Sequence, residues 1–558
     1  MARFSRIVGL GLAFLPAACG APPVPPAQSA NAVSSRERLS RIAESYWDLR
    51  AAQGVSLSAQ SLADALANER QSFAAAAALP RGDLDPESKL TRDIFVRRRA
   101  RLIAGYTYPS ELIPIEPFDS PPMALAREAA KAGEGQLSTV QDYESWLRRI
   151  DEGVLSMRQA VANMREGARR GYTLPKPLVE RMLPLLETLR EDTSDSVFYA
   201  AVHTIPDTIK EPERSDLAAR LTAAVKERLL PAYRQLHDFL QKDYLPKART
   251  SVALSSLPLG ASWYAYRIER ATDGRLSPDE IHAVGLAEVD RIRARMQTLQ
   301  AAVSPAAAID PIAAAEDLKT RVLAAAAPVF GDLPAADFAI RAFTPRYGEE
   351  PMVYQPADAG AHRPAVLFVA ANSAAGKVQT IGVADFLQAA IPGRHLQSAF
   401  QEERTDLPRF RRFEADPAFV EGWALYAATL GEEMGIYVDE QTRHEALARQ
   451  LKCAVALVVD TGLHAKGWAR DRAADYLHVQ LALEDVEARA AADRYIAQPG
   501  DGLACKVGEL KIRSLRSAAQ QSLGARFDIR EFHAQMLKEG SMPLDILDAR
   551  MKAWMEAR

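Results

Sequence analysis

From about residue 35 onward, hydrophobic residues recur at intervals of three and four along almost the whole chain. This spacing places apolar side chains on one face of an α-helix, and the abundance of Ala, Leu, Arg, Glu and Gln favours the same structure. One helix start is especially clear at Ser277, where Pro278 and Glu280 complete a capping box and predict a helix over residues 281–299. The chain is therefore predicted to be mainly α.

Strand patterns are few. Residues 338–344 and 365–371 are short, apolar and flanked by turn residues. They lie just before the segments richest in candidate chemistry, so we expect a small β-sheet beside a cleft. The sequence shows no internal repeat, and we expect one large helical body over residues 35–558. An N-terminal helical part would cover residues 35–260 and a second part, with the motifs, residues 261–558.

The N-terminus predicts export. Arg3 and Arg6 precede a short apolar run at residues 7–15, and small residues then lead to Cys19. This arrangement resembles a bacterial lipobox, in which cleavage before Cys19 leaves a residue that is lipidated, although Pro16 departs from the usual pattern. Simple secretion and an uncleaved anchor remain as alternatives.

The lipobox interpretation makes residues 1–19 a signal peptide and residues 20–34, rich in Pro and Ala, a disordered tether. Gly20 is not the Asp expected of a lipoprotein kept in the inner membrane, so we expect a periplasmic protein with its lipid in the outer membrane. No later apolar run reaches about 20 residues, the length of a spanning helix. The membrane would be contacted only through the N-terminal lipid.

Composition narrows the class of protein. The chain has 558 residues, of which 48% are hydrophobic and 25% charged, as in ordinary globular proteins. A formal net charge of -3 and the absence of a Lys/Arg run argue against a nucleic-acid surface. Cys453 and Cys505 remain in the mature body as two free thiols or as one disulfide, and the sequence leaves this open.

Candidate chemistry is concentrated in four ordered segments, with further characteristic segments on both sides. The four are residues 388–397, 421–427, 458–464 and 494–500, and the flanking segments are residues 257–260, 279–285, 515–516, 527–533 and 540–544. Together they resemble the bacterial family known as domain of unknown function 885, over nearly the whole mature chain. The family's central motif, His-Glu-x-x-Pro-Gly-His-His-Leu-Gln, is similar to a stretched form of the zinc-peptidase helix. The resemblance implies a helical fold around a deep substrate channel, similar to neurolysin-like and carboxypeptidase-Taq-like peptidases.

This chain departs from the family motif at the residues that zinc hydrolysis needs. Gln388 replaces the first His, Ala389 replaces the general-base Glu, and Arg394 replaces the first of the paired His, whereas His395 and Glu421 are kept. An amide is a poor zinc ligand, alanine cannot accept a proton, and a permanent cation repels a divalent ion. We therefore expect no catalytic residue of the family's kind and no zinc cofactor.

Two interpretations follow for the retained carboxylate. Arg394 could pair with Glu421 and supply the positive charge that a metal would have given, or it could point into a water-filled channel. His464, one helical turn after Asp460, could contact a substrate or could be a packing residue. His395, Glu421 and His464 are a weak candidate metal set, because two His and one carboxylate have the right composition but lie beside Arg394.

The last motif contributes Arg494, Tyr495 and, a little further on, Lys506. Such cations would suit the terminal carboxylate of a peptide, or they could form a solvated face. Trp423 and Tyr426, in the segment that begins at Glu421, are expected to be core residues.

Three functions remain open at this point. The first is a pseudoenzyme, an inactive relative of zinc peptidases whose channel binds peptides or an envelope protein. The second is an active peptide hydrolase with a rearranged site, and the third is a structural envelope protein. The sequence names no substrate.

Overall fold

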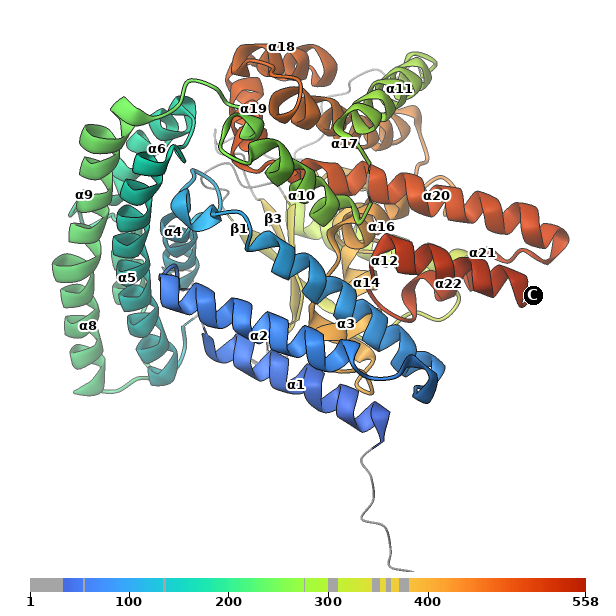
Figure 1. Cartoon of the computed structure of the whole chain (residues 1–558), viewed down its shortest axis with the longest axis horizontal. Helices are drawn as coiled ribbons and strands as arrows, with labels where there is room; N and C mark the ends of the chain where they lie inside the picture. The colour runs from blue at the N-terminus through green and yellow to red at the C-terminus, as the bar shows by residue number, and fades with distance from the viewer. Residues whose placement is uncertain are drawn as a thin grey trace, which may run out of the picture.

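The computed structural model describes residues 34–53, 56–133, 137–274, 276–299, 310–343, 352–357, 363–370 and 381–558. Cys19 and the tether up to residue 33 lie outside the described residues. The fold is mainly helical with one small sheet, as the sequence predicts (Figure 1). No helix in the described part of the chain is both long enough and apolar enough to cross a membrane.

The N-terminal helices share a core with the C-terminal end of the chain. α1 (Ser35–Gln53), α2 (Ala59–Ala77) and α3 (Pro86–Gly105) pack together, and α1 also contacts α15 (Arg409–Phe413). The Phe95 ring meets the rings of Tyr46 and Phe410 edge-on, at centroid distances of 5.5 and 5.0 Å. The same core includes buried side chains of α21 (Ile529–Leu537) and α22 (Leu544–Glu556).

A second core lies within the group of roughly antiparallel helices at the left of Figure 1. Its principal elements are α4 (Pro121–Lys131), α5 (Val140–Arg170), α6 (Lys176–Leu189), α7 (Ala200–His203), α8 (Glu213–Ala223) and α9 (Leu230–Asp238). The longest of these, α5, begins with a capping box at Thr139, which explains why the chain starts a helix there.

Two further cores lie where α17 (Glu440–His464) meets four other helices. These are α10 (Gly260–Thr272), α11 (Pro278–Gln297), α18 (Arg470–Leu481) and α19 (Asp485–Ala497). The capping box predicted at Ser277 is confirmed, because its side chain accepts the backbone N–H of Glu280. α11 ends at Gln297, two residues before the predicted end.

The structure joins Cys453 of α17 to Cys505 of α20 (Ala504–Leu523) as a disulfide, with the two Cα atoms 6.0 Å apart. The two cysteines that the sequence left open are therefore paired. The crosslink joins these two helices through cysteines that are 52 residues apart along the chain.

The sheet has the strand order β1–β3–β2. β1 (Phe338–Phe343) runs parallel to β3 (Ala365–Ala370), and β2 (Met352–Gln355) runs antiparallel to β3. The two predicted strands are confirmed, whereas β2 was not predicted, because four residues carry too little pattern. α12 (Pro311–Phe330) packs against β1 and β3, and every residue of β3 is buried.

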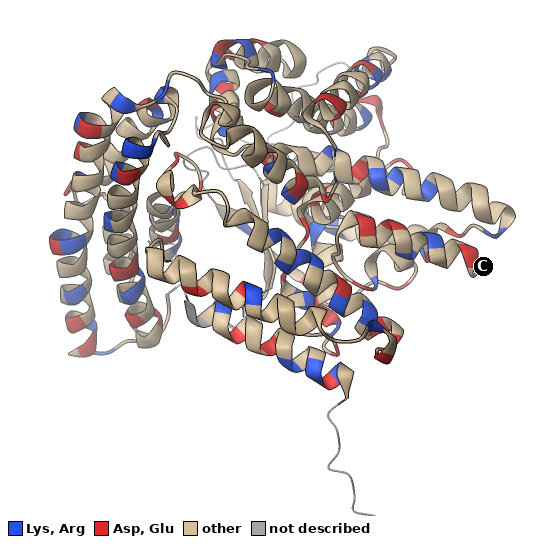
Figure 2. Cartoon of the chain, in the orientation of Figure 1, with Lys and Arg blue, Asp and Glu red and all other residues tan. Residues whose placement is uncertain are grey.

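Three short helices carry the central motif. α13 (Val383–Ala389) and α14 (Arg394–Glu403) both pack against α16 (Pro417–Thr429), and α16 also packs along α20. Trp423 and Tyr426 of α16 are buried, as predicted for core residues. Figure 2 shows basic and acidic residues mixed along the visible helices, in keeping with the small net charge.

Candidate functional site

The turn between α13 and α14 fixes the spacing of the motif. Gly393 is needed there, because a β-carbon at this position would lie 2.0 Å from the carbonyl oxygen of Gln388. The indole nitrogen of Trp423 donates to the carbonyl oxygen of Pro392 at 3.0 Å, so a side chain of α16 anchors this turn. Gln388 and Ala389 consequently end one helix, and Arg394 begins the next.

Arg394 and Glu421 form a two-pronged ion pair. Nε of Arg394 donates to Oε1 of Glu421 at 3.1 Å, and Nη2 donates to Oε2. About a third of each side chain is exposed (27% and 35%), so solvent reaches the pair. The contact that the sequence suggested is present, and both oxygens of the retained carboxylate accept hydrogen bonds from the arginine.

Gln388 is buried and serves a neighbouring helix. Its Oε1 accepts a hydrogen bond from Nε of Arg449 on α17 at 2.5 Å, and the same guanidinium lies 3.5 Å from the carboxylate of Asp385. The adjacent Ala389 is also buried, in the main core. Arg449 was not singled out from the sequence, because nothing in its local pattern distinguishes it from other helix-surface arginines.

The ring of His395 is saturated by protein partners. Nε2 donates to the carbonyl oxygen of Ala336 at 3.1 Å, so Nδ1 is the acceptor and receives the hydroxyl of Tyr354 at 3.0 Å. Tyr354 lies on the unpredicted strand β2 and also contacts Ser398 at 2.8 Å. Burial lowers the pKa of His395, which keeps the imidazole neutral in this network.

His464 is fully buried and bonded to backbone on both sides. Its Nδ1 accepts the N–H of Leu254 at 3.0 Å, and its Nε2 donates to the carbonyl oxygen of Tyr495 at 2.9 Å. Burial lowers the pKa of His464 to about 4. These contacts make His464 a tie between three distant segments of chain, which matches the packing alternative.

Asp460, one turn earlier on α17, is likewise fully buried and hydrogen-bonded to other segments of the chain. It accepts the hydroxyl of Tyr264 at 2.5 Å and the backbone N–H of Gly500 at 2.9 Å. Burial raises the pKa of Asp460 to about 7, because few charges compensate the carboxylate in the interior. The motif around residues 458–464 thus contributes buried polar contacts that hold α10 and the segment after α19 against α17.

Within the described part of the chain, no three His, Cys, Asp or Glu side chains converge as a group that could hold a metal ion. His395, Glu421 and His464, the weak candidate set, are therefore not brought together as ligands. His395 and His464 each have both ring nitrogens in use, and Glu421 is bonded to Arg394.

A cavity of about 790 Å³ opens beside Arg394, within the range of about 300–1,000 Å³ that is typical of small-ligand sites. Its wall combines four arginines with three aromatic side chains and Glu402. The arginines are Arg363, Arg394, Arg409 and Arg412, and the aromatic residues are Trp47, Tyr354 and Phe413. Burial raises the pKa of Glu402 to about 7, so at neutral pH this acid offsets only part of the positive charge.

Arg494 and Tyr495 line a different cavity, of about 840 Å³. The guanidinium of Arg494 lies 4.6 Å from the ring centroid of Phe118, and leucines of α17 and α18 supply apolar wall. Lys506 does not belong with them. It is fully buried, and its Nζ lies 3.3 Å from Glu288 and 3.2 Å from Glu509.

The comparisons with known proteins agree on the fold. The family model described as "Bacterial protein of unknown function (DUF885)" matches residues 46–551. A crystal structure of a candidate lipoprotein from Colwellia psychrerythraea has a TM-score of 0.84 at 22% identity, covering 94% of this chain and 100% of that one. A candidate lipoprotein of unknown function from Shewanella oneidensis has a TM-score of 0.67 at 14% identity, with the same coverage. None of the curated proteins matches the sequence.

Proposed function

Because the chain belongs to the family of bacterial proteins of unknown function called DUF885, we propose that it is an exported lipoprotein and a pseudoenzyme of the zinc-peptidase type. In this proposal its cleft binds a peptide or a segment of an envelope protein without hydrolysing it by zinc chemistry. Lipid attachment at Cys19 and an outer-membrane, periplasmic location are part of the proposal. Two structurally similar proteins are described as candidate lipoproteins, which supports it.

The observation that carries the proposal is the ion pair of Arg394 and Glu421. By the resemblance to zinc peptidases, the positions of Arg394, Glu421 and Gln388 would each supply one zinc ligand. The residues present do not fit zinc, because Arg394 is a cation and already occupies Glu421, and the Gln388 amide is bonded to Arg449. A general base is missing at Ala389 as well.

The cavity beside Arg394 supports the binding part of the proposal. It combines apolar side chains, which can pack on a peptide, with arginines, which can hold carboxylates or backbone carbonyls. The short sheet lies next to it, since Tyr354 and Gln355 of β2 are in the cavity wall.

The test is the zinc content of the purified protein after dialysis against trace zinc, measured by elemental mass spectrometry. We expect close to no zinc per chain and no metal-dependent cleavage of a random peptide mixture. One tightly held zinc per chain would refute the proposal and favour an active hydrolase with a rearranged site.

A restored variant provides the matched comparison. Gln388→His, Ala389→Glu and Arg394→His together rebuild the family motif around Glu421. If the cleft has the peptidase geometry, this triple variant should bind about one zinc per chain, while the Arg394→His single variant should bind far less. A triple variant that folds and still takes up no zinc would count against the zinc-peptidase resemblance itself.

A further inference from the structure

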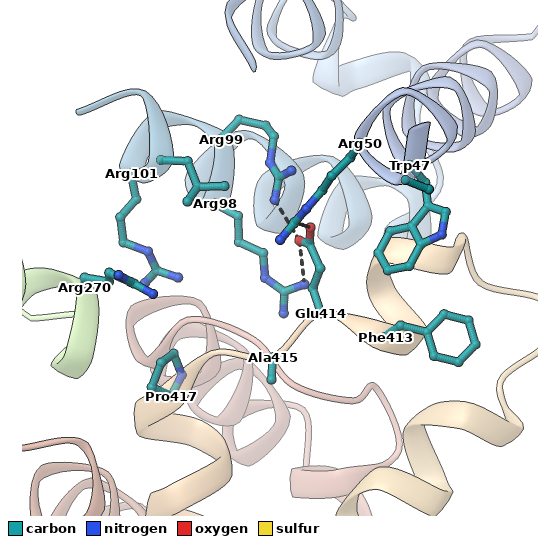
Figure 3. Close-up of a pocket in the computed structure, with 12 residues that line it drawn as sticks. Trp47, Arg50, Arg98, Arg99, Arg101, Arg270, Phe413, Glu414, Ala415 and Pro417 are labelled. Carbon is teal, nitrogen blue, oxygen red and sulfur yellow. Dashed lines mark hydrogen bonds and ion pairs between the residues drawn. The ribbon is translucent and has the colours of Figure 1, made fainter. Parts of the chain in front are cut away.

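A third cavity, of about 490 Å³, shares Trp47 and Phe413 with the one beside Arg394. Figure 3 shows the residues that line it. Arginine is its most frequent lining residue. Five arginines from three helices face it, namely Arg50 of α1, Arg98, Arg99 and Arg101 of α3, and Arg270 of α10. The only acid in the described wall is Glu414.

The pairing of these arginines is uneven. Arg98 is saturated, because it donates to Asp416 and to the carbonyl oxygens of Phe410 and Ser541. Arg101 donates to Asp416 at 2.9 Å and also to Asp273. These two residues therefore hold the wall together.

The other three arginines have donors to spare. Arg50 and Arg99 share one carboxylate, that of Glu414, at 2.5 and 2.7 Å. Arg99 is 1% exposed, yet its Nε and Nη1 make no hydrogen bond within the described structure. Arg270 makes no hydrogen bond or ion pair with any described residue, and the acid that influences it, Asp501, pairs with Arg267 instead. A buried guanidinium with unmet donors is costly unless a ligand supplies the acceptor.

The positive charge also exceeds the negative charge around this cavity. Glu414, Asp416 and Asp273 are the carboxylates that pair with four of the five arginines, all except Arg270. A fourth acid, Glu69, lies 3.6 Å from Nε of Arg99, but burial and the charge of Glu414 raise its pKa to about 8. Near neutral pH five cations thus face three anions at most, which leaves room for a dianion.

We propose that this cavity binds the phosphate group of a small phosphate monoester, whose organic part packs on Trp47 and Phe413. The three arginines with spare donors come from three different helices, α1, α3 and α10. A planar carboxylate has two oxygens and a single charge, whereas a phosphate monoester offers three terminal oxygens and close to two charges. In Figure 3 Trp47 and Phe413 lie on the side of the cavity away from Arg101 and Arg270, and Arg50 and Arg99 lie between them. The inference does not require the proposed peptide cleft, although Trp47 and Phe413 belong to the walls of both cavities.

The test is calorimetric titration of the full-length protein at pH 7.5 with three probes: inorganic phosphate, phenyl phosphate and benzoate. We expect phenyl phosphate to bind most tightly, inorganic phosphate more weakly and benzoate weakest. This order separates a site for the ester from one for the free ion, which would bind both phosphates equally.

Variants locate the binding. Arg50→Gln and Arg270→Gln alter exposed side chains, so the fold should persist, and each should weaken phenyl phosphate about tenfold through loss of a charge-assisted hydrogen bond. Arg148→Gln, on the remote helix α5, is the matched control and should leave the affinity unchanged. Trp47→Leu should weaken phenyl phosphate but not inorganic phosphate. Equal binding of benzoate and phenyl phosphate, no binding of either phosphate, or affinities unaffected by both arginine variants would overturn the proposal.

Discussion

Gly422 of α16 and Gly508 of α20 bring the backbones of their helices into direct contact. A β-carbon on Gly422 would lie 2.4 Å from the Cα atom of Gly508, and one on Gly508 would lie 1.8 Å from the carbonyl oxygen of Ala418. Both obstacles are backbone atoms, which cannot turn aside as a side chain could. Glu421 directly precedes Gly422, so the close packing of α16 on α20 also fixes the position of Glu421.

Gly508→Ala should therefore destabilise the protein by about 3 kcal/mol, the upper part of the usual range for overpacking. The free energy of unfolding from urea titration provides the measurement. Gly82→Ala is the matched control, because a β-carbon there would meet nothing within 4 Å. Equal stability of the two variants would mean that α16 and α20 do not cross as closely as described.

The ion pair of Arg394 and Glu421 should contribute modestly to stability. Solvent reaches both side chains, so the pair resembles a surface bridge, but its two-pronged geometry favours the upper end, about 1 kcal/mol. A double-mutant cycle with Arg394→Gln and Glu421→Gln measures the coupling directly.

The pair of Arg443 and Glu432 is a suitable comparison for that cycle. Its side chains are more exposed, at 37% and 54%, and a cycle there should give only about 0.3 kcal/mol. If the Arg394–Glu421 coupling is no larger, the arginine does not compensate the carboxylate in the way proposed.

Two buried histidines should make the fold sensitive to acid. Burial lowers the pKa of His464 to about 4 and that of His533 to about 3, from an ordinary value near 6.5. At pH 5 these two side chains together bind about two more protons in the unfolded chain than in the folded chain, so their own contribution favours unfolding as the pH falls. Glu69, Glu402 and Asp460, whose pKa values burial raises, act in the opposite direction. The contribution of the two histidines to stability should fall by about 2.7 kcal/mol per pH unit below pH 6, reckoned as 1.36 kcal/mol per proton.

Urea unfolding at pH 7, 6 and 5 tests this slope. His464→Gln should remove about half of it, whereas the exposed His203→Gln should leave it as it is. A His464→Gln variant whose stability varies with pH in the same way as that of the unsubstituted protein would contradict the buried neutral state of this ring.

The disulfide should add about 4 kcal/mol. Closing a loop of 52 residues lowers the conformational entropy of the unfolded chain by that amount in the chain-entropy account. The urea midpoint of the oxidised protein should drop on reduction to that of a Cys453→Ala, Cys505→Ala double variant. An oxidised protein with the same midpoint as this variant would exclude the crosslink.

Local patterns predicted much of the fold. The helical periodicity, the capping box at Ser277 and the strands at residues 338–344 and 365–371 all depend on neighbouring residues, and the structure confirms them. β2 escaped prediction because it is four residues long and gains its stability from pairing with β3.

The site was less predictable, because its contacts join distant segments. The sequence could suggest that Arg394 contacts Glu421, since the family resemblance assigns both residues to positions of the same metal site. It could not show that Gln388 meets Arg449, or that His464 bonds to backbone 210 residues away at Leu254. Neither partner carries a local signal, and only packing of α17 against its neighbours brings them together.

The hydrogen bond from Arg98 to the carbonyl oxygen of Ser541 spans 443 residues. α1, α2 and α3 are synthesised long before α21 and α22, but the core that buries them includes side chains of both later helices. Until then the apolar faces of the first three helices have no lasting partner and are open to aggregation or to a chaperone. Folding of this core therefore has to follow synthesis of α21 and α22, and loss of these two helices would leave α1, α2 and α3 incompletely packed.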